Sequence, residues 1–295
     1  MSAPSRQTSR AGGGRIGAPW AALCLLANVA SAAAPARALG LMAASLPALG
    51  AALAATTLGC SSADAERRKR EDKAEFHYKL AAGYFQASNI DLAIRELVRS
   101  FDFDPEHAES RYLYGFVLFG RKQYEEAAEN FRRALQRNPR FFAARNHLGV
   151  TYLELERFHE AIQIIEPLLG EPLYTTPYLA HNNIGWAYLR LGNMRNAEHH
   201  LRQSVFLNPK FCLGHRNLGL LAKEQRDIDT AVRHLEDATR LCPDNFADAW
   251  WELGELLSER HLERAQDAFR RCRKIAGDSP LGRRCAARIL DSAVQ

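Results

Sequence analysis

The chain has 295 residues, 47% of them hydrophobic and 25% charged, which is enough to bury a core in one large domain or two small ones. Its net charge of +5 comes almost entirely from four arginines in the first 59 residues, and the remainder carries 35 basic against 34 acidic residues. Because there is no basic stripe of the kind that binds phosphates, the composition argues against a nucleic-acid-binding protein.

Residues 1–59 have the layout of an export signal, in which basic residues precede an apolar stretch that ends in small residues. The apolar core at 39–58 is mostly alanine and contains Pro47, which is unfavourable for a permanent membrane span. An upstream apolar block at 20–34 is either a second apolar core or sequence preceding a later start codon. We expect residues 1–59 to be a signal peptide.

The segment around Cys60 resembles the lipobox of bacterial lipoproteins, in which small residues precede a cysteine that is acylated and becomes the mature N-terminus. That family prefers leucine three places before the cysteine, where this chain has Thr57, while Leu58 lies two places before it. The alternative is a buried or incidental cysteine. Because Cys60 lies between an uncharged stretch and a charged one, we expect lipidation, with residues 60–73 as a charged tether. Ser61 in the next position is associated in enteric bacteria with transfer to the outer membrane.

From residue 74 onward the chain repeats a pattern about every 34 residues. Each unit has an alanine, a large apolar residue four places after it, and a glycine (an alanine in the first unit) twelve or, once, eleven places before it. The alanines are Ala93, Ala127, Ala161, Ala197, Ala231 and Ala265. Four units close with a proline, which ends a helix: Pro105, Pro139, Pro209 and Pro243.

This pattern predicts two antiparallel helices per unit, with small residues allowing close approach and bulky residues filling the gaps beside them. It resembles the tetratricopeptide repeat. The resemblance implies an all-α, right-handed superhelical solenoid of six repeats with a C-terminal capping helix. The predicted repeats are 74–107, 108–141, 142–177, 178–211, 212–246 and 247–279, and the cap and tail are 280–295. The third repeat has two extra residues and should carry a longer loop at 171–177.

The sequence contains no phosphate-binding glycine loop, no nucleophile elbow and no zinc-type His/Glu helix motif. We therefore expect no catalytic site, no metal site, no cofactor and no small-molecule substrate. The histidines are expected to be packing or solvated residues rather than ligands. They are His147, His181, His199, His200, His215 and His234.

Four cysteines follow Cys60, and an even number of thiols in an exported protein favours disulfides. Cys212 opens the first helix of the fifth repeat and Cys242 closes the second, so both lie at one end of the antiparallel pair. Cys272 faces the direction from which the capping helix with Cys285 must stack. We expect Cys212–Cys242 and Cys272–Cys285 bonds; the alternative is four small buried apolar side chains.

The phase of the first helix of each repeat predicts the surface that binds a partner. In tetratricopeptide repeats this helix lines the concave side, and here it presents aromatic and aliphatic groups, with Phe85 and Phe119 alternatively packing between helices. Apolar patches with large aromatics are typical of protein interfaces. The predicted partner-binding residues are Tyr78, Tyr112, Phe116, Asn146, Val150, Asn182, Trp186, Leu189 and Arg216.

A lipoprotein-type signal, a charged tether and six tandem repeats together resemble the type IV pilus pilotins (the PilF/PilW/Tgl family). The Ala-rich leader and the cysteine pairs suggest the Tgl-like branch. The resemblance implies a non-enzymatic lipoprotein, anchored on the periplasmic face of the bacterial outer membrane, that helps an outer-membrane secretin assemble. The alternatives are a periplasmic scaffold for cell-wall synthesis or cytochrome maturation, and a recruiting domain of an envelope enzyme, for which the chain has no catalytic domain.

Overall fold

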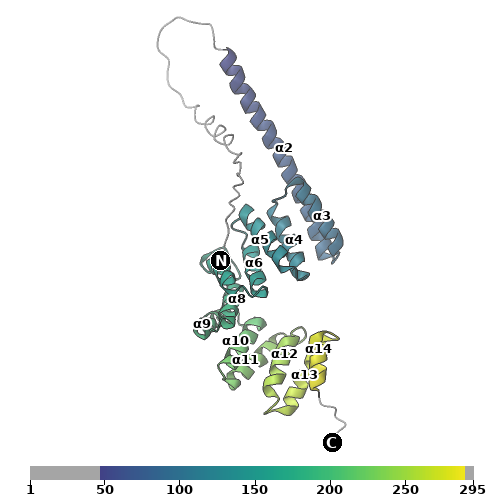
Figure 1. The fold of residues 1–295 in the computed structure, drawn as a ribbon, viewed down its shortest axis with the longest axis vertical. Coiled ribbons are helices and arrows are strands. Elements are labelled where there is room, and N and C mark those ends of the chain that lie inside the picture. Colours follow the sequence, from purple (N-terminus) through teal and green to yellow (C-terminus); the bar gives the residue numbers. More distant parts are fainter. Residues whose placement is uncertain (1–46, 290–295) are drawn as a thin grey trace, which may run out of the picture. The chain divides into compact units, whose positions relative to one another are not determined.

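The computed structural model describes the backbone of residues 47–289 and the side chains of residues 62–289 (Figure 1). The predicted signal peptide up to residue 46 and the side chain of Cys60 lie outside the described residues. The chain divides into two units, residues 1–70 and residues 71–295, and the second contains the repeats. Within the described part, no helix combines the length and hydrophobicity that a membrane span requires.

The described residues form helices joined by short turns, which confirms the predicted all-α repeat fold. Helices pair in sequence order, and the pairs follow the predicted repeats to within one residue. The first pair is α2 (Pro47–Gln86), from residue 74 onward, with α3 (Ile90–Phe103). The following pairs are α4 (Ala108–Gly120) with α5 (Tyr124–Arg137), α6 (Phe142–Glu154) with α7 (Phe158–Ile165), α8 (Pro177–Arg190) with α9 (Met194–Leu207), α10 (Cys212–Glu224) with α11 (Ile228–Leu241), and α12 (Ala247–Leu257) with α13 (Leu262–Ala276). The cap is α14 (Pro280–Arg288).

The repeated alanines and bulky residues form the core within each helix pair. All six alanines of the repeat pattern are fully buried. The bulky residues four places later are also buried, with at most 1% of their surface exposed: Leu97, Phe131, Ile165, Leu201, Leu235 and Phe269. The spacing that defines the repeat in sequence is therefore the spacing that fills the interface between paired helices.

The repeated glycines allow the paired helices to approach closely. A Cβ atom added at Gly149 would lie 2.2 Å from Cγ1 of Ile165, and one added at Gly254 would lie 2.6 Å from Cε1 of Phe269. Both separations are far below van der Waals contact, so any side chain at these positions would push the helices apart.

The third repeat differs from the others in its second helix. Helix α7 ends at Ile165 and continues as a 3₁₀ turn, η1 (Glu166–Gly170). Pro167 explains the early end, because proline cannot donate to the helical ladder and its ring clashes with the preceding turn. The predicted loop at 171–177 therefore follows a shortened helix, a feature that sequence analysis did not assign to Pro167.

The segment 60–73, predicted as a tether, is helical throughout and forms part of α2. It contains neither proline nor glycine and is rich in alanine, glutamate, lysine and arginine, which are strong helix formers. Side chains from 62 to 70 are exposed. The composition that indicated a solvated segment thus also favours a continuous helix.

Candidate protein-binding surface

The predicted partner-binding residues all lie on the first helices of their repeats: the end of α2, then α4, α6, α8 and α10 (Figure 1). We call the side that these helices form the A-helix face. Asn146, Asn182 and Leu189 are at most 8% exposed. The other six, Tyr78, Tyr112, Phe116, Val150, Trp186 and Arg216, are half-buried. The A-helix face is therefore a largely packed surface rather than a row of free apolar groups.

An aromatic cluster connects the first three repeats. The ring of Phe116 lies edge-on to Phe85 at 5.7 Å and to His147 at 5.2 Å. Tyr112 is 4.8 Å from Phe141 and 5.5 Å from His147, between ring centroids. Phe85 therefore packs against the neighbouring first helix, which was the alternative to a role in binding a partner.

His147 lies inside this cluster and is neutral. Its Nδ1 donates to the carbonyl of Ala143 at 2.9 Å and lies 3.3 Å from the hydroxyl of Tyr112. Burial lowers the pKa of His147 below its ordinary value, and the hydrogen bond to Ala143 opposes this only in part. Burial likewise raises the pKa of Tyr112. The cluster is thus an uncharged surface in the physiological pH range.

Asparagines form a ladder across the middle of the A-helix face. The side-chain amide of Asn183 donates to Oδ1 of Asn146 at 3.1 Å, that of Asn182 donates to Oδ1 of Asn183 at 3.2 Å, and that of Asn217 donates to Oδ1 of Asn182 at 2.9 Å. Asn146 and Asn182 were predicted to bind a partner. Since both already bond to neighbouring repeats, the ladder first serves to hold α6, α8 and α10 in register.

The chemical nature of the A-helix face changes near Trp186 and Arg216. Trp186 packs against two core clusters, and the guanidinium of Arg190 lies 5.6 Å from its ring centroid. Arg216 faces Glu252, with Nη2 3.9 Å from Oε1, and Lys223 approaches the same carboxylate at 3.3 Å. The face is therefore aromatic in repeats one to three, amide-lined in the middle and charged in repeats five and six.

A cleft of about 230 Å³ opens beside the loop of the third repeat. Its apolar lining comes from Phe142 and Leu179, and from Leu173, whose surface is 65% exposed. Asn146 and His147 contribute polar edges. Only Asn146 among these was predicted as a site residue; the two-residue insertion in the third repeat was the signal that could have found the rest.

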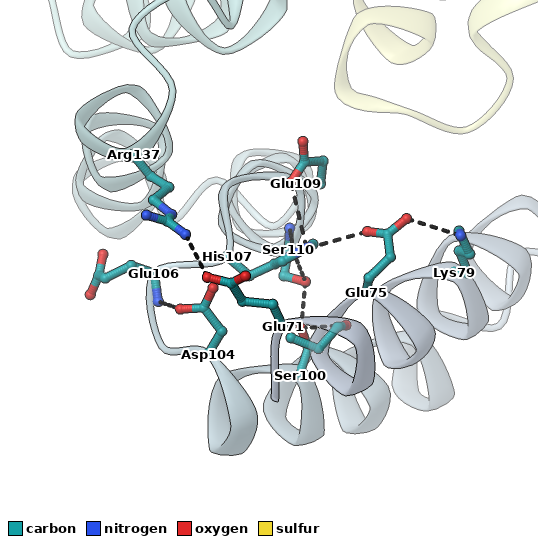
Figure 2. A network of polar contacts seen from close by, with 11 residues as sticks. Glu71, Glu75, Lys79, Ser100, Asp104, Glu106, His107, Glu109, Ser110 and Arg137 are labelled. Atoms are coloured by element: carbon teal, nitrogen blue, oxygen red, sulfur yellow. Dashed lines mark hydrogen bonds and ion pairs between the residues drawn. The ribbon is translucent and has the colours of Figure 1, made fainter. Parts of the chain in front are cut away.

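A second cleft, of about 450 Å³, lies in the first two repeats and is lined mostly by carboxylates. Figure 2 shows that the side chains around it contact one another. His107 Nε2 lies 3.2 Å from Glu75, and Arg137 lies 3.3 Å from Glu71. Ser100 and Ser110 share a hydrogen bond of 2.7 Å. This network ties α2, α3, α4 and α5 together, so we interpret it as structural.

The structure brings the cysteines of each predicted pair close together. Cys212 and Cys242 have Cα atoms 6.1 Å apart, and Cys272 and Cys285 have Cα atoms 6.0 Å apart, separations that a disulfide spans. Cys272 and Cys285 are fully buried. The first pair joins the two ends of one repeat, and the second attaches the cap to the sixth repeat.

In four repeats a polar residue of the first helix lies close to a polar residue of the second helix. The first residue lies four places before the repeat glycine (or Ala81), and the second lies three places after the repeat alanine. The pairs are His77–Glu96 at 2.7 Å, Arg111–Asn130 at 3.0 Å, His181–His200 at 3.1 Å, and His215–His234 with ring centroids 5.8 Å apart. Burial and the neighbouring His181 and His199 lower the pKa of His200 from 6.5 to about 4. Burial also lowers the pKa of His234. Both rings are thus neutral at physiological pH.

Three stretches of the chain match known protein families. Residues 178–211 and 216–280 match families described as tetratricopeptide repeat, and residues 72–168 match subunit 3 of the anaphase-promoting complex, or cyclosome. Residues 178–211 and 216–280 of the chain are therefore tetratricopeptide repeats. This agrees with the helix pairs, the buried alanines and the close approach at the repeat glycines.

The relatives of this chain include a protein of type IV pilus assembly. The type IV pilus assembly protein PilF of Pseudomonas aeruginosa is 25% identical over 159 residues, covering 54% of this chain and 60% of PilF. Tetratricopeptide repeat protein 6 of Homo sapiens is 22% identical over 153 residues, which cover 52% of this chain and 29% of the human protein. The chain thus spans less than two thirds of either relative.

Solved structures of PilW and PilF share the fold. PilW, described as a widely conserved type IV pilus biogenesis factor, superimposes with a TM-score of 0.63 at 19% identity, covering 72% of this chain and 98% of PilW. P. aeruginosa PilF gives 0.59 at 20% identity, covering 74% and 99%. The matched chain of the Cut9–Hcn1 complex gives a TM-score of 0.63 at 16% identity, and the match covers 74% of this chain and 43% of that chain. The resemblance to PilF and PilW is confirmed, while the equal score for Cut9–Hcn1 means that these superpositions establish the fold alone.

Proposed function

We propose that this chain is a non-enzymatic, lipid-anchored protein that binds the outer-membrane secretin of the type IV pilus and promotes its assembly. The observation that carries the proposal is the similarity to PilF, which extends over 159 residues of this chain. The lipobox-like sequence at Cys60 adds a membrane anchor, and a tetratricopeptide array supplies a surface suited to binding an extended or helical segment.

We place the partner's apolar segment at the cleft of the third repeat. The A-helix face was predicted to bind through its aromatic groups, but those groups are mainly packed against one another. The cleft instead combines the exposed Leu173 with the apolar side chains of Phe142 and Leu179. Burying such groups against an apolar partner gains roughly 25 cal/mol per Å² of surface removed from water.

A charge at Leu173 tests this surface. Leu173→Glu should leave the protein folded, because changes at exposed positions usually alter stability by no more than about 0.5 kcal/mol. It should sharply reduce secretin multimers and surface pili, because an unpaired carboxylate would have to be desolvated on binding. The matched control is Phe206→Glu, which places the same charge at a side chain that is 78% exposed. Phe206 lies on α9, the second helix of the fourth repeat.

The comparison of the two variants is decisive. Loss of multimers with Leu173→Glu and normal multimers with Phe206→Glu supports the cleft as the binding surface. Normal multimers with both variants would move the surface elsewhere. If deletion of the whole chain leaves secretin multimers and pili unchanged, the secretin function itself is wrong, and a scaffold for another envelope machine becomes the better proposal.

The lipid anchor is tested separately. Cys60→Ala should release the protein from the membrane fraction or leave it unprocessed, because no acyl chain can then be attached. Cys24→Ala, in the same leader, is the control and should behave like the unaltered protein. If Cys60→Ala fractionates and migrates as the unaltered protein does, the anchor is not at Cys60.

A further inference from the structure

Three potential metal ligands converge in the fifth repeat. His215 lies on α10, and His234 and Asp237 lie one turn apart on α11, so that one ligand atom from each falls within 4.8 Å of the others. Metal binding was not expected from sequence, because these residues are separated along the chain and match no ligand motif. The pairing of the two helices brings them together.

The hydrogen bonding of His215 leaves a nitrogen free to bind a cation. Its Nε2 lies 3.0 Å from the carbonyl of Pro209, and since a carbonyl can only accept, Nε2 carries the hydrogen. In neutral imidazole, Nδ1 then bears a lone pair. Only 9% of His215 is exposed, and its Nδ1 is buried without a hydrogen-bond partner, as is Nδ1 of His234.

The contact to Pro209 belongs to the repeat architecture. In the second repeat, Arg111 at the equivalent position donates its Nε–H to the carbonyl of Pro105 at 2.7 Å. This position therefore needs a donor toward the preceding repeat, and histidine meets that need with one nitrogen only. A metal-bound histidine commonly donates its other N–H to a backbone carbonyl, which fixes the ring and its tautomer.

Asp237 distinguishes this pair of histidines from the pair one repeat earlier. The equivalent of Asp237 in the fourth repeat is Gln203, so His181 and His200 have no carboxylate at that position. Arg240 bonds Oδ1 of Asp237, while Oδ2 faces His215 Nδ1 at 3.8 Å. One carboxylate oxygen is thus directed toward the two orphaned imidazole nitrogens.

We infer that His215, His234 and Asp237 form a binding site for one divalent transition-metal ion, with Zn²⁺ as the best match. Two imidazole nitrogens and one carboxylate oxygen are a ligand set that zinc accepts, with an open fourth position for water. Tetrahedral zinc requires ligand atoms about 3.4 Å apart, given Zn–N distances of about 2.0–2.1 Å. His234 and Asp237 are half-buried, so small side-chain rotations can close the remaining gap.

Positively charged side chains near the site oppose the binding of a cation. Arg202 and Arg233 lie near enough to His234 to disfavour its protonation, and they disfavour a bound cation for the same reason. We therefore expect weaker binding than in structural zinc sites, which have four protein ligands. A bound ion would clamp α10 to α11 at the end of the repeat that Cys212 and Cys242 also join. This inference is independent of the secretin proposal.

Calorimetric titration with ZnCl₂ tests the site, using the full-length chain in detergent without a histidine tag and with any free thiols alkylated. We expect one equivalent of Zn²⁺ to bind and to raise the melting temperature. A parallel titration with Co²⁺ should give the visible absorption of a nitrogen- and oxygen-ligated ion. His234→Gln and Asp237→Asn should each weaken binding by roughly tenfold or more, in line with losses at metal-site residues.

His200→Gln is the matched control, because it removes the equivalent histidine of the fourth repeat and should leave binding unchanged. Asp237→Asn keeps the shape of a half-buried side chain, so circular dichroism should show the native fold even if His234→Gln proves unstable. The inference is overturned if no saturable equivalent of Zn²⁺ binds, or if Asp237→Asn binds as tightly as the unaltered chain. It is equally overturned if His200→Gln abolishes binding, since the ion would then lie in the fourth repeat.

Discussion

The second to fourth repeats and the last two repeats build the same helix pairs in different ways. From α4 to α8 one continuous core runs across repeat boundaries, with large aromatics such as Phe131, Tyr152 and Trp186 packed in or against it. The last two repeats have a separate, smaller core around Phe269, and it is here that the paired cysteines occur. The comparison indicates that one repeat pattern can be stabilised by aromatic volume in one region and by cross-links in another.

Removing aromatic volume from the continuous core should have the largest effect. Phe131→Ala deletes a fully buried ring and should lower the free energy of unfolding by about 3–5 kcal/mol, as large core truncations do. Urea denaturation followed by circular dichroism measures the loss. Phe206→Ala, at a side chain that is 78% exposed, is the control and should change little. A loss below about 1 kcal/mol for Phe131→Ala would contradict a continuous aromatic core.

Breaking the cross-links should cost nearly as much in the last repeats. The Cys212–Cys242 pair is separated by 30 residues and the Cys272–Cys285 pair by 13, and loop-closure entropy then gives a stabilisation of about 3–4 and about 3 kcal/mol, respectively. Non-reducing peptide mapping should find these two pairs in material from an oxidising compartment. Reduction should increase hydrogen exchange in α10–α14 much more than in α4–α6. Four free thiols would refute the pairing and leave the alternative of buried apolar cysteines.

Acid should weaken the fourth repeat, which borders the last two repeats and contains His200. The pKa of His200 falls from 6.5 to about 4 on folding, so between these pH values the unfolded chain binds a proton that the folded chain does not. Stability should therefore fall as the pH drops from 6.5 to 4, and be unaffected by this group outside that range. Because His200 is partly exposed, we expect roughly 1–2 kcal/mol. His200→Gln should flatten the melting temperature across this window; an unchanged pH profile would contradict the assignment.

The smallest effect should come from the turns between paired helices, which recur from the first repeat to the fifth. In each of the first five repeats the turn between the paired helices has a residue with positive φ, such as Lys122 (61°) in the second repeat and Gly192 (74°) in the fourth. A non-glycine residue in this region costs roughly 1 kcal/mol. Lys122→Gly should therefore stabilise the chain by up to about 1 kcal/mol, and Gly192→Ala should destabilise it by a similar amount. Thermal melts of both variants check this, and equal signs would contradict it.

The repeat fold could be predicted from sequence because its determinants are local and periodic. Ala127, Phe131 and Gly115 lie within one repeat, and the same offsets recur in the others. The extent of α7 was not predicted, although Pro167 was visible, because the expected pattern placed the helix end later. The Cys212–Cys242 pair could be predicted because both residues lie at helix ends that the antiparallel arrangement brings together. The Cys272–Cys285 pair could be predicted because the capping helix must stack on the sixth repeat.

The candidate sites depended on contacts between repeats, which sequence periodicity does not specify. The sequence placed Tyr112, Phe116 and Trp186 on one face of their helices, but their exposure depends on how closely the next first helix packs. The orientation of Leu173 beside Phe142 depends on the path of one irregular loop.

The sequence by itself determined the helix pairs, the number of repeats and the neutrality of the repeat region, because these follow from residue spacing and composition. Tertiary structure alone decided that Asn182 bonds to Asn183 and accepts from Asn217, and that His215, His234 and Asp237 meet. The physical reason is that hydrogen bonding and metal ligation require specific atoms to lie within a few ångströms of one another. Such distances are set by the packing of helices from different parts of the chain.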